Sequence, residues 1–115
     1  MATKRYDPTA TDFNGRYARW VAALESGTEA ELLEAISYYS AIRADLGVRF
    51  EQAVSHAVRA AVAHPERGAP RSRSTRRWLV TGFPFGVIYR ARPEEVVIVA
   101  VAHERKRPEY WVRRV

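Results

Sequence analysis

The chain has 115 residues, 47% of them hydrophobic, which indicates one folded domain rather than a disordered chain. It has no cysteine, which excludes a disulfide framework and a thiolate zinc site. The net charge of +6 is unevenly distributed, because residues 1–66 carry 7 basic and 9 acidic side chains whereas residues 67–115 carry 12 and 4. A basic half suits an acidic partner, although such a charge pattern is also compatible with an ordinary solvated surface.

The N-terminal residues are polar and show no targeting segment. Residues 1–18 lack both clear periodicity and the apolar core of a signal peptide, and we interpret them as an extension in front of a domain at residues 19–115. The longest apolar run, residues 96–102, is too short to cross a bilayer. We therefore expect a cytoplasmic protein that does not contact a membrane.

The first predicted elements are a short strand and a helix. Residues 19–25 are moderately apolar and predict a strand, although their alanine and leucine content also allows the end of a helix. A helix is predicted from Ser26 to about Arg43, because Ser26 and Glu29 have the spacing of a capping box and the apolar residues behind them recur at helical spacing.

A second helix is predicted close behind the first. Residues 45–47 contain a glycine and are expected to break the helical pattern, which resumes over residues 48–63. Pro65 ends it, since the residue before a proline disfavours helical geometry. The short connection predicts that the two helices form an antiparallel hairpin.

The C-terminal half predicts a small antiparallel sheet. Residues 66–75 are rich in Gly, Pro, Ser and Arg and are expected to form a loop. Three strands are predicted at residues 76–82, 85–92 and 95–103, and their short connections require antiparallel pairing. Residues 104–115 are expected to form a charged tail. The fold class is therefore α+β in the order β-α-α-β-β-β, with the helices covering one face of the sheet.

Two groups of basic residues flank the predicted sheet. The group before it suits a phosphate backbone or an acidic protein, or is simply an exposed linker. The group after it mixes cations with aromatic rings, as in proteins that bind single-stranded nucleic acid, although Trp111 is equally suited to packing in the core. The first group consists of Arg67, Arg71, Arg73, Arg76 and Arg77, and the second of His103, Arg105, Lys106, Arg107, Tyr110, Trp111, Arg113 and Arg114.

The sequence contains no motif for a metal or a cofactor. The histidines His56, His64 and His103 lack the spacing of a metal-binding pair and have no carboxylate cluster beside them. A glycine-rich phosphate loop and a nucleophile elbow are also missing from the sequence. We therefore expect no metal, no cofactor and no small-molecule substrate.

Four stretches of the chain, taken together, resemble the RelE/ParE family of type II toxin–antitoxin toxins. They are AELLEAISYYSAIRADLGVRFEQAV, HPERG, RRWLVTGFPFGVIYRAR and VVIVAVAHERKRPEYW, which match in order and spacing over roughly residues 19–114. The resemblance implies a helical hairpin packed on a small antiparallel sheet. It also implies a toxin that arrests growth and is neutralised by a cognate antitoxin, whose tail wraps the toxin as an apolar segment with acidic residues.

Two mechanisms in this family require different residues. RelE-like members cut mRNA on the ribosome, and here only His103, Glu104 and Tyr110 are candidates for acid and base, because arginine holds its proton. ParE-like members target DNA gyrase and need no catalytic set. The ending AHERKRPEYW resembles the ParE branch more closely, so gyrase poisoning is the preferred hypothesis. The alternatives are a ribosome-dependent mRNA endonuclease and a degenerate, non-toxic module that binds an antitoxin or nucleic acid.

The resemblance and the charge pattern together suggest two contact surfaces. Target contact is expected from Arg76, Arg77, Arg90, Arg105, Lys106, Arg107, Tyr110, Trp111 and Arg113. Antitoxin contact is expected from Arg67, Arg71, Arg73 and Trp78.

Overall fold

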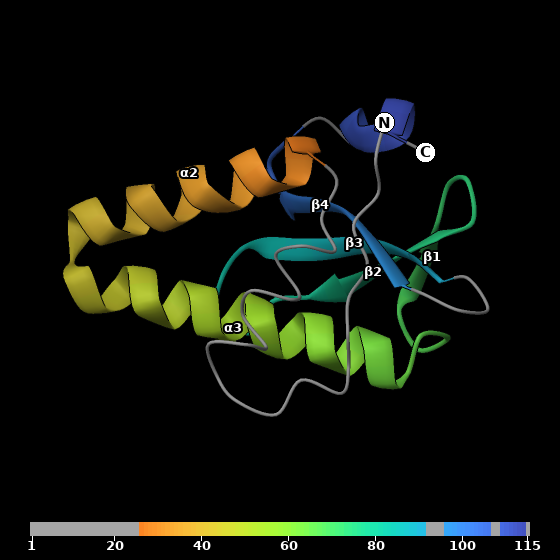
Figure 1. Cartoon of the computed structure of the whole chain (residues 1–115), viewed down its shortest axis with the longest axis horizontal. Helices are drawn as coiled ribbons and strands as arrows, with labels where there is room; N and C mark the ends of the chain where they lie inside the picture. The colour runs from red at the N-terminus through yellow and green to blue at the C-terminus, as the bar shows by residue number, and fades with distance from the viewer. Residues whose placement is uncertain (1–25, 92–95, 107–108, 115) are drawn as a thin grey trace.

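The chain folds into two layers, a helical hairpin and an antiparallel sheet that lies against it (Figure 1). This is a computed structural model, and it describes residues 26–91, 96–106 and 109–114. The strands pair antiparallel in the order β1-β2-β3-β4, and α2 and α3 pack against each other, which confirms the predicted α+β class and the helical hairpin. The helices are α2 (Ser26–Ile42) and α3 (Ala44–Ala63), the strands are β1 (Ala69–Arg71), β2 (Thr75–Leu79), β3 (Phe85–Ala91) and β4 (Val96–His103), and the 3-10 helix η1 spans Tyr110–Arg114.

The helical hairpin is tighter than the sequence predicts. Only Arg43, in extended conformation, separates α2 from α3, so the break expected at residues 45–47 is wrong. Gly47 lies inside α3, where a Cβ atom would stand 1.9 Å from the Ser40 Oγ of α2. This glycine therefore allows the two helices to approach each other closely instead of ending one of them.

The first hydrophobic core fills the space between the hairpin and the sheet. Apolar side chains of α3 recur at helical spacing and meet side chains of β3 and β4 that point toward the helices. An aromatic group closes one end of this core, with ring centroids 4.9–6.2 Å apart, in the range where tilted and edge-to-face rings attract each other. Its members are Tyr39, Phe50, Phe83 and Phe85.

The opposite face of the sheet carries a second, smaller core. Ile88, Val97, Val99, Ala100 and Trp111 are buried there, and Trp111 comes from η1. The sequence predicts that β4 is covered on at least one face, because its residues are apolar without interruption, and the structure covers it on both. The tail thus closes the face that the helices leave open.

A β-bulge in β4 explains how two successive residues face this second core. The pairing of β3 with β4 shifts between Ile88 and Tyr89, and Val99 is the extra residue. The Val99 carbonyl accepts hydrogen bonds from the buried hydroxyl of Thr28 and, at 3.0 Å, from Nη1 of Arg114. The carbonyl at the bulge is therefore satisfied by side chains of α2 and η1.

Two further elements differ from the sequence-based expectation. Residues 69–71, expected in a loop, form the edge strand β1, which tolerates Pro70 because an edge strand does not need every amide donor. Residues 110–114, expected in a charged tail, form η1. Within the described part of the chain, no helix is long and apolar enough to cross a membrane. Three features lie outside the described residues: the extension at residues 1–18, the strand predicted at residues 19–25, and the Ser26 side chain of the predicted capping box.

Candidate functional site

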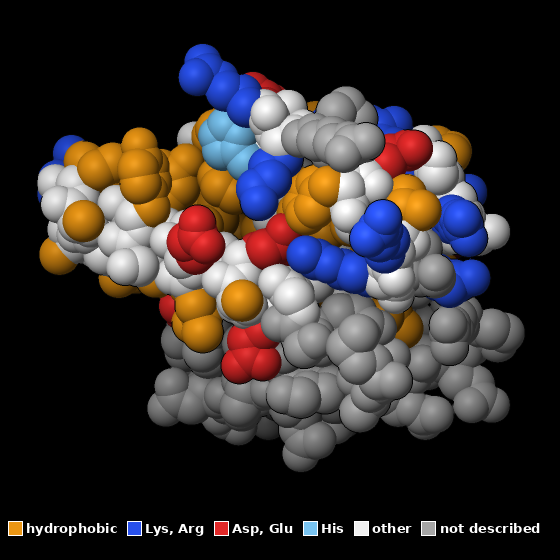
Figure 2. Space-filling model, turned by 90° about the horizontal axis from the view of Figure 1, so that it is seen from above, with side chains coloured by type: hydrophobic (Ala, Val, Ile, Leu, Met, Phe, Trp, Pro, Cys, Tyr) orange, Lys and Arg blue, Asp and Glu red, His pale blue; other side chains and the backbone are white. Residues whose placement is uncertain are grey.

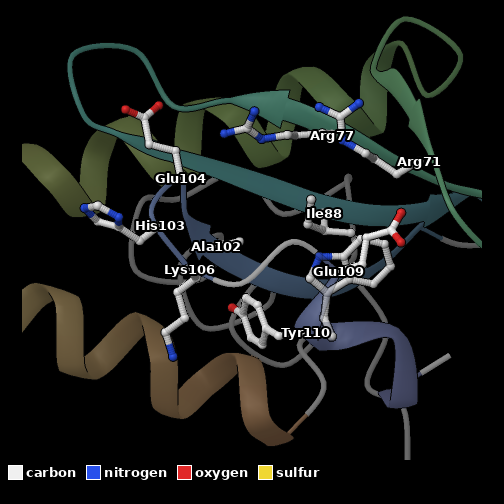
Figure 3. A pocket seen from close by; sticks show the side chains of 10 residues that line it. Arg71, Arg77, Ile88, Ala102, His103, Glu104, Lys106, Glu109 and Tyr110 are labelled. Atoms are coloured by element: carbon white, nitrogen blue, oxygen red, sulfur yellow. The ribbon is translucent and has the colours of Figure 1, made fainter.

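Seven of the residues selected from the sequence meet at one hollow, which we call the basic pocket. It has a volume of about 380 Å³ and lies on the sheet face opposite the helical hairpin, beside η1 (Figure 3). Its lining residues are Arg71, Arg77, Ile88, Ala102, His103, Glu104, Lys106, Glu109, Tyr110 and Trp111. Figure 3 shows Arg71 and Arg77 on the β2 side of the pocket and Lys106 and Tyr110 on the opposite side.

Arg77 is positioned by a glycine on the neighbouring strand. It lies in β2, opposite Ile88 of β3. Gly86 is buried in β3, and a Cβ atom there would stand 2.2 Å from the Arg77 Nε. The absence of a side chain at Gly86 therefore leaves the space in which the Arg77 side chain crosses the sheet toward the pocket.

Tyr110 is held by a group of side chains that we call the Glu31 network, formed by Glu31, Tyr110 and Arg114. The Glu31 carboxylate accepts hydrogen bonds from the Tyr110 hydroxyl, from Arg114 Nη1 at 2.8 Å and from the Val101 amide at 3.3 Å. Burial, followed by the hydrogen bond to Glu31, holds the pKa of Tyr110 well above its ordinary value. The network joins η1 to the N-terminal half of α2 and fixes one wall of the basic pocket.

Residues 103–106, which we call the C-terminal turn, form the next wall of the pocket through His103, Glu104 and Lys106. The Glu104 amide donates to the Pro84 carbonyl at 2.9 Å, and the Lys106 amide donates to the His103 carbonyl at 3.0 Å. The His103 Nδ1 accepts from the Arg105 amide at 2.9 Å, which leaves Nε2 as the nitrogen that carries the proton in the neutral ring.

Two aromatic contacts hold side chains of the C-terminal turn in place. The His103 ring stands edge-on to Phe85, with centroids 4.9 Å apart. The Lys106 Nζ lies 4.9 Å from the centroid of the Tyr110 ring, a cation–π distance. In Figure 3 the His103 ring points away from Tyr110, so these two of the three candidates for acid and base do not face each other.

The rim of the pocket beside Arg71 contains backbone in the left-handed region. Arg73 and Ser74, in the turn between β1 and β2, have φ angles of 59° and 60°, and Glu109 has a φ angle of 60°. Non-glycine residues adopt this region at a cost, and only where other contacts hold them. The Ser72 hydroxyl, which donates to the Glu109 carboxylate, is one such contact and ties this turn to the start of η1.

Arg76 makes a contact within the fold. Its Nη1 donates to the Gly68 carbonyl at 2.8 Å. The Tyr89 hydroxyl, on the adjacent strand, donates to the Pro65 carbonyl at 2.7 Å and accepts from the Gly68 amide at 3.0 Å. Arg76 and Tyr89 therefore attach the turn after α3 to the sheet, and this bond limits the freedom of Arg76 to bind a target.

The two tryptophans of the predicted contact surfaces are not freely exposed. Trp111 is only 3% exposed and packs in the second core, so it offers little surface to a partner. Trp78 is half-buried against the first core. Large aromatic side chains bury much apolar area, which favours these positions over solvent.

Five of the remaining predicted contact residues lie outside the basic pocket. Arg67, Arg73, Arg105 and Arg113 are exposed, and Arg90 is half-buried in β3. Arg107 lies outside the described residues.

A second hollow, which we call the helix groove, runs between α2 and the C-terminal end of β4 and has a volume of about 530 Å³. Figure 2 shows apolar side chains gathered on the part of the surface that the helical hairpin forms, with Lys and Arg and also Asp and Glu side chains beside them. The groove is lined by Glu31, Glu34, Ala35, Tyr38, Tyr39, Ile42, Pro84, Phe85, Val101, His103, Glu104, Arg105 and Lys106.

Three functional features were missed by sequence reasoning. Neither Glu31 nor Gly86 was singled out from the sequence as a site residue. The helix groove was also missed, although the sequence carries one sign of it. Tyr38 lies beside the apolar stripe of its helix and is a large aromatic residue that has no place in the core.

The comparisons with known proteins give one family. A family model described as the ParE toxin of the type II toxin–antitoxin system, parDE, matches residues 8–108. The match covers most of the chain and includes part of the stretch that we interpreted as an N-terminal extension. No curated protein matches the chain. Among the described residues, no group of His, Asp and Glu side chains could hold a metal ion.

Proposed function

Because the chain belongs to the ParE toxin family of type II toxin–antitoxin systems, we propose that it arrests growth by poisoning DNA gyrase and that a cognate antitoxin neutralises it. Family membership gives the class of toxin, whereas the gyrase target and the neutralisation by an antitoxin are proposed. Gyrase is the target that the resemblance implies for ParE-like members, which act by binding and need no catalytic side chains of their own.

The observation that carries this choice of target is the use of Tyr110 in the Glu31 network. Its hydroxyl donates a hydrogen bond to Glu31, and burial raises its pKa further above an ordinary value that already leaves tyrosine protonated at neutral pH. A general base must take up a proton from its substrate, so Tyr110 is better suited to anchoring η1 than to proton transfer. The arginines of the basic pocket also hold their protons. The chemistry of the pocket thus favours binding over catalysis.

The proposed target surface consists of the basic pocket and the exposed cations beside it. Arg77, Arg105 and Lys106 supply positive charge, and arginine can bind a carboxylate or a phosphate through two parallel hydrogen bonds. Arg71 was assigned to the antitoxin from the sequence, yet it lines the same pocket. We therefore expect target and antitoxin to compete for this region.

The second candidate function is ribosome-dependent mRNA cleavage, and one observation favours it. His103 and Glu104 line the same pocket as Arg77, so a titratable imidazole and a carboxylate stand near a cation that could stabilise a phosphate. In this mechanism His103 would act as acid or base, and replacing it with alanine would abolish cleavage.

Purified protein separates the two targets. We expect inhibition of supercoiling by DNA gyrase and no cleavage of mRNA on translating ribosomes. The double variant Arg77→Ala/Arg105→Ala should lose inhibition, whereas the control Arg49→Ala/Arg59→Ala removes equal charge from exposed positions of α3 and should retain it. Cleaved mRNA with unaffected supercoiling would refute the gyrase proposal. Normal growth after induction of folded protein would refute toxicity and leave the non-toxic binding module.

A further inference from the structure

Two cations of the basic pocket lack the carboxylate partners that other cations of the fold have. Arg43, Arg49 and Arg114 each form an ion pair with an aspartate or a glutamate. In the part of the chain that the structure describes, no hydrogen bond or ion pair involves the guanidinium of Arg77 or the ammonium of Lys106. Arg77 is half-buried, and a charge removed from water without a partner is costly. An anion from outside the chain would lower this cost.

These cations face one hollow from opposite sides. The Arg77 side chain passes over Gly86 toward the pocket, and Arg71 stands on the same side, where Nη1 donates to the carbonyl of the neighbouring Pro70 at 3.1 Å. Lys106 lies on the opposite side (Figure 3). A ligand in the pocket is therefore met by positive charge from two directions.

The aromatic side chains of the pocket are already in use. The Lys106 Nζ and the Arg114 Cζ lie 4.9 Å and 5.4 Å from the centroid of the Tyr110 ring, and Trp111 is only 3% exposed. Proteins that hold nucleobases do so largely by stacking them on open aromatic rings. The pocket is thus better suited to the backbone of a nucleic acid than to its bases.

The charge of the pocket favours an anion with a single negative charge. Arg71, Arg77 and Lys106 line it together with Glu104 and Glu109, so one positive charge remains in excess when the histidine is neutral. A phosphodiester carries one negative charge, whereas a terminal phosphate group carries nearly two. Its two free oxygens also point in different directions, which suits cations on two walls, while both oxygens of a carboxylate can be bound by one guanidinium.

We propose that the basic pocket holds a phosphodiester of the DNA backbone, so that the toxin contacts the DNA of the gyrase–DNA complex as well as the enzyme. Arg71 and Arg77 bind the phosphate from the sheet side, and Lys106 binds it from the C-terminal turn. The contact does not depend on base sequence, because phosphate contacts carry none. This inference rests on the proposed gyrase target and adds the part of the complex that the pocket recognises.

Binding of duplex DNA without gyrase tests the pocket by itself. Fluorescence anisotropy of a labelled duplex compares wild type with the pocket variant Arg77→Gln/Lys106→Gln, which keeps part of each stem, and with the control Arg49→Gln/Arg59→Gln, which removes equal charge from exposed positions of α3. The pocket variant should bind about tenfold more weakly, with a salt dependence shallower by about one in logarithmic slope, and the control should stay within about twofold of wild type. Equal losses in both variants would overturn the inference.

Isoleucine methyl signals in NMR locate the DNA on the unmodified protein. Ile88 lines the basic pocket, Ile42 lines the helix groove and Ile98 lies in the first core. The duplex should shift the Ile88 signal and leave those of Ile42 and Ile98 unchanged. Polyglutamate at the same concentration of charge should shift Ile88 much less. An equal shift with polyglutamate would show a site for carboxylates, and would overturn the choice of phosphate.

Titrations of gyrase with and without DNA separate this inference from the proposed function. Wild type should bind the gyrase–DNA complex about tenfold more tightly than gyrase alone, because two contacts act together. The pocket variant should bind both with the affinity that wild type has for gyrase alone. A variant that loses affinity for gyrase alone would show that the pocket contacts protein, and would overturn the inference. If wild type binds gyrase in neither state, the proposed function fails, and the DNA titration still decides whether the pocket holds a phosphodiester.

Discussion

Replacement of Glu31 by alanine should destabilise the protein far more than an ordinary surface change. The substitution removes the one carboxylate that accepts from Tyr110, Arg114 and the Val101 amide together. It therefore detaches η1 from α2 and leaves a guanidinium without its counter-ion beside the second core.

The expected size of the effect follows from the burial of the pair. The Glu31 and Arg114 side chains are 15% and 23% exposed, so water reaches them only in part. A hydrogen bond to a charged group contributes about 1.5–3 kcal/mol, and removing one partner of a fully buried ion pair costs about 3–5 kcal/mol. Because some solvent can replace the lost carboxylate, we expect the free energy of unfolding to fall by about 2–4 kcal/mol.

Urea denaturation measures this change. With an m-value of about 2 kcal/mol per molar urea, the midpoint should fall by about 1–2 M without a change in slope. The matched control is Glu34→Ala, which removes an exposed carboxylate from the same helix and should change stability by less than about 0.5 kcal/mol. If both variants have the same midpoint, the Glu31 network does not anchor η1 and the reasoning is wrong.

Three further predictions concern single contacts. Gly86→Ala should change the free energy of unfolding by less than about 1 kcal/mol, because the flexible Arg77 side chain can move aside. It should weaken target inhibition as much as Arg77→Ala does, and the double variant should be no weaker than either single variant; an additive loss would contradict this. The free energy of unfolding should fall as pH rises above about 10, because folding raises the pKa of Tyr110 and the tyrosine therefore ionises first in the unfolded chain. In denaturation measured at several pH values, Tyr110→Phe should make this fall less steep; the same dependence on pH in both proteins would contradict the prediction. Gly47→Ala should lower the free energy of unfolding by about 1–3 kcal/mol despite the better helix propensity of alanine, because the new Cβ would clash with Ser40. A higher melting temperature of this variant would disprove the close approach of α2 and α3 at this position.

The hairpin, β2 and β3 could be predicted from local periodicity, and β4 from its uninterrupted apolar run. The break at residues 45–47 was misplaced because a glycine that permits close helix packing looks the same in sequence as one that ends a helix. The strand β1 was missed because its three exposed residues include a proline and carry no alternation. The 3-10 helix was missed because its anchor, Glu31, is 79 residues away from Tyr110 in the chain.

The residues of the site could be predicted from the sequence, but the role of each residue could not. The sequence identified the basic residues near the sheet, and several of them line one pocket. It could not indicate that Arg76 and Arg114 are bonded to the fold itself, because that depends on which carbonyl or carboxylate lies within reach. The exposure of Tyr38 and Ile42 likewise depends on where the sheet ends against α2.

The bulge at Val99 has a consequence for the choice of strand pairing. A run of seven apolar residues, 96–102, lacks the polar alternation that normally tells a strand which face to bury, so a slip by one residue would cost little in buried area. The bonds from Thr28 and Arg114 to the Val99 carbonyl exist in only one of these alignments. Two polar side chains from opposite ends of the described chain thus select a single register among alignments that hydrophobicity alone leaves nearly degenerate.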